Sequence, residues 1–499
     1  MRHKLWLLSA PVALFLMLAL SLYLGGDQLS RIPLPSFTSE GSILTTNPTQ
    51  DTGNITQNTG EIIQDAEESA QDVEESTQDG GDGAPDAGNS KQDASNSTQD
   101  PSHVTHGPSN ITTIAQDVVD ITNSSKPSKD NVIKDAANIT SYIDAIMDIQ
   151  AHSLTRLECP DLNSTRYSNL KASNQGSSIE YFFALDLRQC LTLLPTLLGS
   201  ILEAMRFLGP ERCALSIVEG HSPDGTYDVV TAIRQDVKNI GASYFIQPSK
   251  IDPSKGDRIQ KLAELRNLAL RPLIDNTDRV TDTTTVLFLN DVAICTEDIL
   301  ELLFQRTALG ATMTCAMDWT YVGHDPTFYD VWVARGINGD SFFEVPPDGN
   351  WNWAWNLFWN AEETQARFYE NLPFQAFSCW NGAVTFAASV VTKEGLRFRR
   401  ANREKKECEQ GEPQLFCKDM WFHGLGKIAV IPTVNLEYSV EKGEMIKKAK
   451  GFVSDHVATQ DPAGDKFEWA VEPPAKVKCT PTWDHQFWKA WNETLSKRK

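Results

Sequence analysis

The chain has 499 residues, of which 45 are Lys or Arg and 66 are Asp or Glu, and its formal net charge is −21 at pH 7. The sequence has neither a GxxxxGK(S/T) loop nor a GxGxxG motif, which excludes a P-loop nucleotide hydrolase and a Rossmann dinucleotide enzyme. It also lacks the CxxC and His spacing of a structural zinc site, and we expect no nucleic-acid partner.

The N-terminus has the pattern of an uncleaved membrane anchor. The basic stretch "MRHK" is followed by the uncharged run Leu5–Leu24, which is long enough to cross a bilayer as a helix. The following "SLYLGGDQ" offers no convincing small-x-small cleavage site. Because Arg2 and Lys4 precede the run, residues 1–26 are expected to be a cytosolic tail and transmembrane signal anchor. The remainder would lie in the lumen of the Golgi or another secretory compartment, as in a single-pass type II protein.

Residues 27–150 are expected to form a disordered acidic stalk. Between residues 40 and 100 there are fourteen acidic residues and one basic residue, Lys91, for a net charge of −13. The dipeptide Gln-Asp recurs there at intervals of seven or fourteen residues, but the apolar positions of a coiled coil are missing. Such segments bury too little apolar surface to order themselves. Most of the negative charge therefore belongs to the stalk and says little about the ligand of the folded part.

Seven Asn-x-Ser/Thr sequons and nine cysteines fit a glycosylated protein of an oxidising compartment. The sequons begin at Asn54, Asn96, Asn110, Asn123, Asn138, Asn163 and Asn492. All nine cysteines lie from Cys159 onward, and their odd number leaves at least one without an intramolecular partner. Cys408 and Cys417 flank a short loop, and we predict that these two form a disulfide.

From about residue 178 the pattern becomes that of a globular domain with alternating strands and helices. The predicted strands are 180–187, 213–220, 243–248, 286–291 and 311–319, and the predicted helices are 191–205, 225–240, 258–270 and 297–304. Strands that alternate with helices of this length predict a doubly wound, mainly parallel α/β sheet.

Acidic residues end most of these predicted strands. Asp186, Glu219, the pair Asn290-Asp291 and Asp318 stand at the ends of the first, second, fourth and fifth strands. In a parallel sheet these ends share one edge, where ligands bind. Each acid could instead cap the following helix. For Asp291 this is the weaker interpretation, because Glu297 and Asp298 already provide the negative charge at the N-terminus of the next helix.

Clustered oxygen ligands favour Mg²⁺ or Mn²⁺, and such an ion would bind the phosphates of a substrate. A metal, a phosphate-bearing donor and a membrane-anchored lumenal enzyme together point to a nucleotide sugar.

Several segments together resemble the fungal capsule-associated α-1,3-mannosyltransferase family, of the cryptococcal type. They are "YFFALDL", "LSIVEGHSPDGT", "LAELRNLAL", "VLFLNDVAICTEDILELL", "CAMDW", "FYDVWVARGINGD", "PFQAFSCWNGA" and "CEQGEPQLFCKDMW", in the family's order over about residues 178–440. The resemblance implies a GT-A-like fold, GDP-mannose as donor, a mannose-containing glycan as acceptor and a type II membrane protein. Residues 151–325 would then form the nucleotide-sugar-binding half, and residues 326–499 the acceptor half and C-terminal tail.

The resemblance also implies a donor site. Its expected members are Ala184 and Asp186 at the base and ribose, Glu219, Ser222 and Asp224 after the second strand, and Arg258, Arg266 and Asn267 at the diphosphate. Asn290 and Asp291 stand at the place of the family's Asp-x-Asp metal motif, but Val292 follows them where that motif has a second acid. The expected cofactor is a divalent cation, Mn²⁺ or Mg²⁺.

In the acceptor half, Trp380 and Asn381 combine a flat ring with an amide, which suits a sugar but also suits a tight turn. Asp318, Glu412 and Asp419 are expected catalytic residues, and His423 is a possible further metal ligand. The alternative for the charged segment that carries Glu412, Asp419 and His423 is a solvated loop without a catalytic role. Trp351, Trp355 and Trp359 would share one face of a helix, where core packing competes with a sugar platform.

The expected reaction is an α-1,3-mannosyl transfer with retained configuration, through a carboxylate nucleophile or with the leaving phosphate taking the acceptor's proton. The alternative is a catalytically inactive glycan-binding or scaffolding paralogue with the same fold, which Asn290 in place of a first Asp keeps open. A glycosidase with paired carboxylates is the poorer alternative, because it leaves Arg258 and Arg266 unexplained.

Overall fold

The computed structural model describes residues 136–148, 150–151, 153–171, 178–220, 222–458 and 465–495. The predicted anchor and the sequons from Asn54 to Asn123 lie outside these residues. The three sequon asparagines inside them, Asn138, Asn163 and Asn492, are exposed. Among the described helices, the segment Leu191–Leu208 has the length and apolar composition of a membrane span, and 78% of it is buried within the domain, as expected for a core helix.

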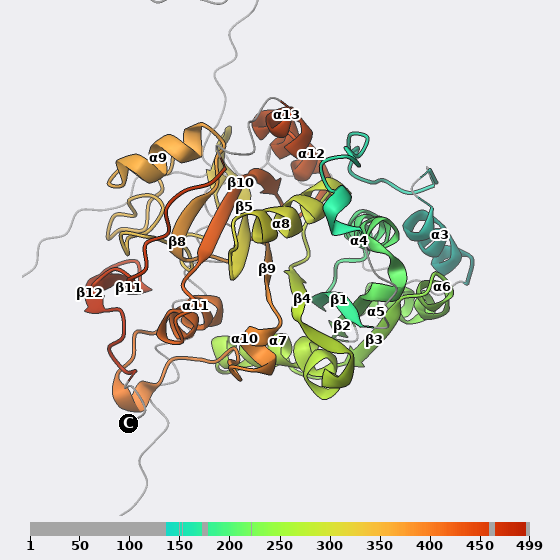
Figure 1. Cartoon of the computed structure of the whole chain (residues 1–499), viewed down its shortest axis with the longest axis horizontal. Coiled ribbons are helices and arrows are strands. Elements are labelled where there is room, and N and C mark those ends of the chain that lie inside the picture. Colours follow the sequence, from blue (N-terminus) through green and yellow to red (C-terminus); the bar gives the residue numbers. More distant parts are fainter. Residues whose placement is uncertain are drawn as a thin grey trace, which may run out of the picture. The chain divides into compact units, whose positions relative to one another are not determined.

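In the described part of the chain, ten strands form one sheet (Figure 1). In order across the sheet they are β3 (Ser243–Pro248), β2 (Cys213–Glu219), β1 (Ile179–Leu187), β4 (Val280–Leu289), β9 (Ala383–Ala387), β5 (Met313–Val322), β10 (Ile428–Leu436), β8 (Phe374–Ser378) and β7 (Arg335–Gly336), with β6 (Asp325–Phe328) paired to β5. A separate hairpin is formed by β11 (Lys476–Thr482) and β12 (His485–Ala490).

The sheet is mainly parallel, as the sequence predicts. β1 is parallel to β2 and β4, β2 is parallel to β3, and β5 is parallel to β10. β9 is antiparallel to both β4 and β5, so β4 and β5 run in the same direction. The carboxyl ends of six strands therefore meet at one edge. β6, β7 and β8 are antiparallel to their neighbours and extend the far side of the sheet.

The helices cover both faces of this sheet. They are α3 (Ala136–Met147), α4 (Leu194–Leu208), α5 (Thr226–Ala232), α6 (Arg234–Asn239), α7 (Arg258–Asp275), α8 (Thr296–Ala308), α9 (Glu362–Tyr369), α10 (Ser389–Thr392), α11 (Glu412–Phe422), α12 (Val440–Lys450) and α13 (Val453–Val457). Figure 1 shows α4 and α8 on one side of the sheet, with α7 and α10 on the other.

Alternating side chains of each strand fill two separate cores, as strand geometry requires. On β1, Phe183 and Leu185 pack into the core that α4 and α8 cover, whereas Phe182 and Ala184 pack into the core that α7 and α11 cover. Because a strand with both faces covered is apolar throughout, its first polar side chains appear where it leaves the sheet. This places the acids at the carboxyl edge.

Elements of the described fold cross two of the predicted domain boundaries. The sheet is shared by the two proposed halves, because β9, from the region assigned to the acceptor half, lies between β4 and β5. The stalk was predicted to run to residue 150, but residues 136–147 form α3, whose Ala145 and Ile146 are fully buried. Arg156 fixes the end of this helix by donating to the carbonyl of Ala145 at 2.9 Å. The low-complexity composition ends before α3, and the apolar face of this short helix was overlooked.

The position of α3 changes what a stalk truncation should do. We expect a chain that begins at residue 136 to keep the stability of the full chain, and one that begins at residue 151 to lose about 2–4 kcal/mol, because the buried side chains of α3 leave exposed apolar surface on α4. Urea unfolding of the two truncated proteins measures the difference. Equal stability of the two would contradict a structural role for α3.

Candidate active site

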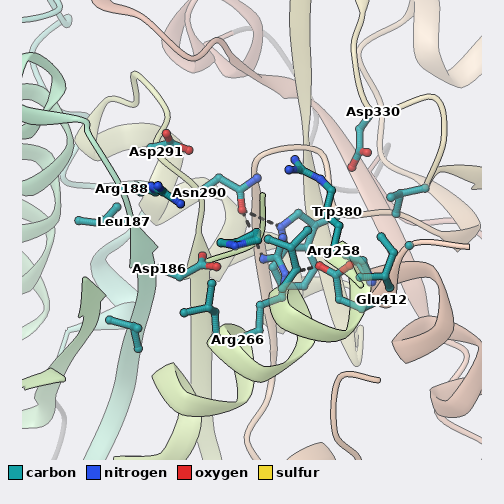
Figure 2. A pocket seen from close by; sticks show the side chains of 18 of the residues that line it. Asp186, Leu187, Arg188, Arg258, Arg266, Asn290, Asp291, Asp330, Trp380 and Glu412 are labelled. Carbon is teal, nitrogen blue, oxygen red and sulfur yellow. Dashed lines mark hydrogen bonds and ion pairs between the residues drawn. The ribbon is translucent and has the colours of Figure 1, made fainter. Parts of the chain in front are cut away.

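A cavity of about 470 Å³ opens at the carboxyl ends of β1, β2 and β4. Its wall includes Asp186, Leu187, Arg188, Val218, Gly220, Ile251, Arg258, Arg266, Asn290, Asp291, Tyr329, Asp330, Trp332, Trp380, Glu412 and Tyr438. Segments far apart in the sequence therefore meet here: the ends of three strands, the N-terminal part of α7, the loop after β6 and the start of α11. Figure 2 shows Asp186 and Asp291 on one side of Arg266 and Trp380, with Asp330 and Glu412 on the other.

Asp186 and Asp291, at the ends of β1 and β4, are two carboxylates in a poorly hydrated environment. Burial raises the pKa of Asp186 to about 6, although the charge of Arg266 opposes this. Burial also raises the pKa of Asp291 to about 6, with a further contribution from the charge of Asp186. The prediction that these two side chains share one edge is confirmed. Their negative charge is the feature of this end of the cavity that a cation would relieve.

Arg266 is the central side chain of the cavity wall. It is 7% exposed, and its Nε donates to Oε1 of Glu412 at 2.7 Å. Its guanidinium lies 4.3 Å from the ring centre of Trp380, a cation–π distance. Burial alone would lower the pKa of Arg266, but Asp186 and Glu412 outweigh that effect and raise it. Arg266 therefore stays charged and joins α7 to the start of α11.

Asn290 connects three parts of the cavity wall. Its Oδ1 accepts from Nε1 of Trp380 at 2.9 Å and from Arg266 at 3.4 Å (Figure 2). Its backbone N–H donates to the carbonyl of Gly382 at 2.9 Å. The amide oxygen thus accepts two hydrogen bonds from the protein, and the metal-ligand role expected for Asn290 stays a prediction. Asn290 fixes Trp380 and the loop after β8.

Trp380 and Asn381 were predicted to bind the acceptor, but both are buried, at 2% and 0% exposure. Asn381 adopts a left-handed backbone with φ of 56°, and its side-chain amide donates to the carbonyl of Ala316 at 2.8 Å. Its backbone N–H donates to Oδ2 of Asp330 at 2.9 Å. The tight-turn alternative is thus confirmed for Asn381, since an Asn is among the residues that tolerate this conformation. The turn shapes the cavity wall.

The acid of β5 lies below the cavity surface. Asp318 was expected to end its strand, but β5 continues to Val322 and Asp318 is fully buried within it. Its Oδ2 accepts from the hydroxyl of Tyr438 at 2.6 Å, and its Oδ1 accepts from the backbone N–H of Asp330 at 3.3 Å. Burial, followed by the charge of Asp330, raises the pKa of Asp318. Asp318 therefore supports Tyr438 and Asp330 and does not itself line the cavity.

Of the predicted diphosphate-binding residues, Arg258 and Arg266 line the cavity. Arg258 is the first residue of α7 and is exposed, and no described residue forms an ion pair or hydrogen bond with it. Arg188, which follows β1, also lines the cavity and was missed. It pairs with Asp252 at 2.9 Å. The signal for Arg188 was its place directly after a predicted strand.

The remaining predicted donor residues hold the fold around this end. Ala184 is buried in β1, and Glu219, at the end of β2, accepts hydrogen bonds from the backbone and side chain of Ser222. Asp224 accepts from the backbone N–H groups of Thr226 and Leu191, so it caps local turns. Asn267 exchanges hydrogen bonds with the backbone of Phe398 at 2.8 and 3.0 Å. None of these side chains is part of the cavity wall.

Two predicted acceptor-half residues lie elsewhere. Asp419 is on α11, two turns beyond Glu412, and binds Arg399 at 2.7 Å. His423 contacts Glu394 at 3.0 Å. Both border a second depression and neither borders the cavity, so the structure does not bring them together with the other predicted site residues. Helical spacing explains the separation of Asp419 from Glu412, because residues seven apart on α11 are about 10 Å apart along its axis.

The tryptophan-rich segment is not a helix. Residues 351–359 form turns, Trp353 and Trp355 are 47% and 69% exposed, and Trp351 packs edge-on against Phe343 at 5.6 Å. The predicted helical face therefore does not exist. Neither this segment nor its exposed rings belong to the cavity wall.

The predicted disulfide between Cys408 and Cys417 is wrong. Cys408 pairs with Cys479 on β11, and Cys417 is a buried thiol of α11 whose Sγ lies 3.9 Å from the sulfur of Met313. The other disulfides are Cys159–Cys295 and Cys315–Cys379, and the free cysteines are Cys190, Cys213 and Cys417. The prediction relied on the short sequence separation between Cys408 and Cys417, but Cys417 faces the core, away from Cys408. In each disulfide, one cysteine is close in sequence to a residue of the cavity wall: Cys295 to Asp291, Cys379 to Trp380, and Cys408 to Glu412.

Carboxylates and arginines line a cavity at the carboxyl edge of a mainly parallel α/β sheet, which is where sheets of this kind bind ligands. Comparison with known proteins makes this specific. The family model described as cryptococcal mannosyltransferase 1 matches residues 180–419. The α-1,3-mannosyltransferase CMT1 of Cryptococcus neoformans var. neoformans serotype D is 36% identical over 373 residues, which is 71% of this chain and 79% of that protein. The chain belongs to the cryptococcal mannosyltransferase family and is a hexosyltransferase.

Solved structures of other glycosyltransferases are more distant. The mannosyltransferase PcManGT from Pyrobaculum calidifontis, in complex with GDP-Man and Mn²⁺, is 10% identical with a TM-score of 0.31, over 60% of this chain and 66% of that one. The S. aureus TarS 1–349 complex with UDP is 13% identical with a TM-score of 0.30, over 57% and 68%. Because these scores are low, the assignment rests on the sequence relative.

Proposed function

We propose that this enzyme transfers mannose from GDP-mannose to a mannose-containing glycan, forming an α-1,3 linkage with retained configuration. The observation that carries the proposal is the 36% identity to an α-1,3-mannosyltransferase over 79% of that relative's length. The cavity supports it, because a donor needs cationic and carboxylate groups together, and both line this wall.

The donor diphosphate would lie at the start of α7. Arg258 is exposed there without a described ion-pair partner, and it is followed by the first turn of an 18-residue helix. A helix N-terminus presents free N–H groups and a partial positive charge, which favours phosphate. Asp257 caps the helix through the backbone N–H of Gln260 at 3.0 Å, so the turn is ordered before a ligand arrives. Arg188 would approach from the end of β1.

A divalent cation would be held at the end of the cavity that carries Asp186 and Asp291. The described residues contain no cluster of three or more His, Cys, Asp or Glu side chains able to hold a metal by themselves. Mg²⁺ in nucleotide sites, however, usually takes only one or two carboxylates and completes its shell with phosphates and water. Asp291 and Asp186 would provide those two carboxylates. A bound cation would supply positive charge for the departing GDP.

The transfer breaks the bond between C1 of mannose and the diphosphate oxygen and forms a bond from C1 to the acceptor oxygen. Arg266 holds Asn290 and Glu412 in fixed positions through hydrogen bonds, and Asn290 in turn holds Trp380. These contacts give the reacting groups a rigid, poorly hydrated wall, in which charges stabilise the developing phosphate charge more strongly than in water.

We also propose a lumenal location in the secretory pathway, with the membrane anchor at residues 1–26. Disulfides form and persist in oxidising compartments. Three of them, Cys159–Cys295, Cys315–Cys379 and Cys408–Cys479, join the described part of the chain, and the exposed sequons at Asn163 and Asn492 would be accessible to glycosylation there.

The direct test is transfer by the purified full-length enzyme from labelled GDP-mannose to an α-mannose oligosaccharide, with Mn²⁺, with Mg²⁺ and with EDTA. We expect a product with one added mannose that an α-mannosidase removes, and loss of transfer in EDTA. UDP-glucose serves as the control donor. Transfer from UDP-glucose but not from GDP-mannose would overturn the donor assignment, and a β-linked product would overturn retention.

A further inference from the structure

Among the aromatic side chains of the cavity wall, Tyr329 and Trp332 are the ones that a ligand can reach. Both stand in the loop after β6, where Tyr329 is 38% exposed and Trp332 is half-buried. The other rings of the wall are engaged by the protein: Trp380 is 2% exposed, and Tyr438 donates its hydroxyl to Asp318 at 2.6 Å. The loop after β6 therefore presents two flat apolar surfaces to the cavity.

The order of the strands places these rings away from the donor. Leu187 and Val218 line the cavity at the ends of β1 and β2, the side on which the donor would bind. Tyr329 follows β6, which pairs with β5, and β4 and β9 lie between β1 and β5 in the sheet. Figure 2 shows the next residue, Asp330, on the opposite side of the cavity from Asp186. A donor over β1 and β2 leaves the β5 side of the cavity to the acceptor.

The ring of Trp332 is fixed by the segments that flank it. Its Nε1 donates to the carbonyl of Thr480 on β11 at 2.7 Å. Cys479, the preceding residue, forms a disulfide with Cys408, which lies shortly before α11. A Cβ on Gly411 would lie 3.4 Å from the Trp332 ring, so the ring packs against the backbone directly before α11. A ring that is already held in place loses little conformational entropy when a ligand packs on it.

Tyr329 is supported from the other side of the loop. Its ring centre lies 5.2 Å from that of Tyr438, and its backbone N–H donates to the carbonyl of Asp318 at 3.1 Å. The hydroxyl of Tyr438 is bound to the side chain of the same aspartate. Both tyrosines are therefore tied to β5, and the exposed ring of Tyr329 rests on a buried one.

Asp330, between Tyr329 and Trp332 in the sequence, adds a hydrogen-bond acceptor to the two rings. Its Oδ2 accepts from the backbone N–H of Asn381 at 2.9 Å, which fixes the carboxylate. Its Oδ1 accepts no hydrogen bond from a described residue. Flat rings beside a carboxylate offer a sugar both an apolar contact for its C–H groups and an acceptor for its hydroxyl groups.

We propose that Tyr329, Asp330 and Trp332 form the acceptor subsite, in which a mannose ring of the glycan packs its C–H face on Trp332. Tyr329 contacts the same glycan, and Asp330 accepts a hydrogen bond from one of its hydroxyl groups. The inference rests on the proposed mannosyl transfer. Asp330 takes no proton in this arrangement, so the subsite contributes binding and orientation and leaves the retained configuration unchanged.

The experiment compares full-length wild type with W332A, W332F and Y329A, with an α-linked mannotriose as acceptor. We expect W332A to raise the KM for the mannotriose about 10–100-fold, with kcat within about fivefold of wild type, because truncation of an aromatic anchor removes much of the local binding energy. W332F keeps a flat ring and should raise this KM by less than about fivefold, with Y329A between the two. Calorimetric titration of mannotriose into enzyme loaded with GDP and Mn²⁺ measures the same losses without turnover.

Two controls separate the subsite from the donor site and from a general effect of removing a tryptophan. The KM for GDP-mannose and the affinity for GDP should stay within about twofold of wild type in the three variants, because the rings lie away from the donor. W355A is the matched control, since Trp355 is 69% exposed and lies outside the cavity wall. It should leave the KM values for both substrates unchanged.

Several results would overturn the proposal. An unchanged KM for mannotriose in a folded W332A would remove the stacking contact, and a loss in W332F as large as that in W332A would show that the ring face is not what the glycan contacts. Weaker GDP binding in W332A would mean that the ring packs on guanine. An equal effect of W355A would place the acceptor outside the cavity. If W332A fails to fold, an unchanged KM for mannotriose in Y329A decides against the subsite.

Failure of the subsite can be told apart from failure of the proposed function. If the wild type does not use GDP-mannose, the proposed function fails. If the wild type transfers mannose and the variants bind the acceptor equally well, only the subsite fails.

Discussion

The variant D291N is expected to lose transfer activity by more than about 100-fold while keeping its fold, because the amide removes the carboxylate charge that would hold a cation and its diphosphate. Asp291 is partly buried two residues beyond the end of β4, and apart from a hydrogen bond with its own backbone its side chain forms no hydrogen bond or ion pair with another described residue. Its replacement therefore breaks no contact that stabilises the domain. The charge is kept at this edge at a cost, since burial raises its pKa to about 6.

The raised pKa of Asp291 also predicts whether D291N is more or less stable than wild type. A carboxyl group whose pKa is higher in the folded state than in the unfolded one destabilises the fold progressively as the pH rises above the unfolded value, and the effect is complete above the folded value. At pH 7 Asp291 is in that range, so ligand-free D291N should be as stable as wild type or more so. Activity and stability then move in opposite directions, as they often do at functional sites.

Thermal unfolding, calorimetric titration with GDP and Mn²⁺, and transfer kinetics together test this variant. D282N is the matched control, because Asp282 lies on the same strand with an exposed side chain that pairs with Lys393. It should match wild type in all three measurements. Near-normal transfer by D291N would mean that Asp291 has no part in holding a cation.

The strands and helices of the parallel part of the sheet could be predicted because each depends on the residues of its own segment. β1 to β5 and the helices between them follow from apolar runs and helical spacing, and Asp186 and Asp291 share one edge because the carboxyl ends of parallel strands meet there. Pairing between strands that are far apart in the sequence produces no local pattern from which it could be predicted. Nothing in the sequence of β9 shows that it lies antiparallel between β4 and β5.

The site was predicted less well because residue type does not show which way a polar side chain faces. Asn267 and Asn381 suit a sugar or a phosphate, but both are engaged by the protein backbone. Cys408 pairs with a partner 71 residues away, which spacing cannot reveal. Asp330 ends no predicted strand, and its position depends on the β5–β6 hairpin and the Asn381 turn. It was part of a segment that carried the family resemblance, yet no local rule singled it out.

Replacing Arg266 with methionine is expected to cause the largest loss of stability, about 3–5 kcal/mol in the free energy of unfolding, because breaking a buried ion pair leaves an uncompensated charge. Arg266 and Glu412 are 7% and 2% exposed, and their ion pair measures 2.7 Å. The variant also removes the cation from the face of Trp380 and the positive charge beside Asp186. The side chain of methionine is shorter but has a similar volume, so the loss reflects the missing guanidinium charge and its contacts more than lost volume.

A double-mutant cycle separates the ion pair from the other charges. E412Q alone should cost less than R266M, because Arg266 would still face Asp186 and Asp330, both of which influence its charge. In R266M/E412Q the buried carboxylate is gone, so part of the loss should be recovered, giving a favourable coupling energy between the two positions of at least about 1 kcal/mol. Urea unfolding of the wild type, both single variants and the double variant supplies the four values.

The same helix provides the control. Arg271 on α7 forms an exposed ion pair with Asp275 at 3.2 Å, and its side chain is 67% exposed. R271M should change the free energy of unfolding by less than about 1 kcal/mol, because solvent screens such pairs. An R266M protein that is no less stable than R271M, or a cycle without coupling, would show that Arg266 does not join α7 to α11. If the expected values are found, the charge that shapes the cavity also holds together the two elements that carry its opposite walls.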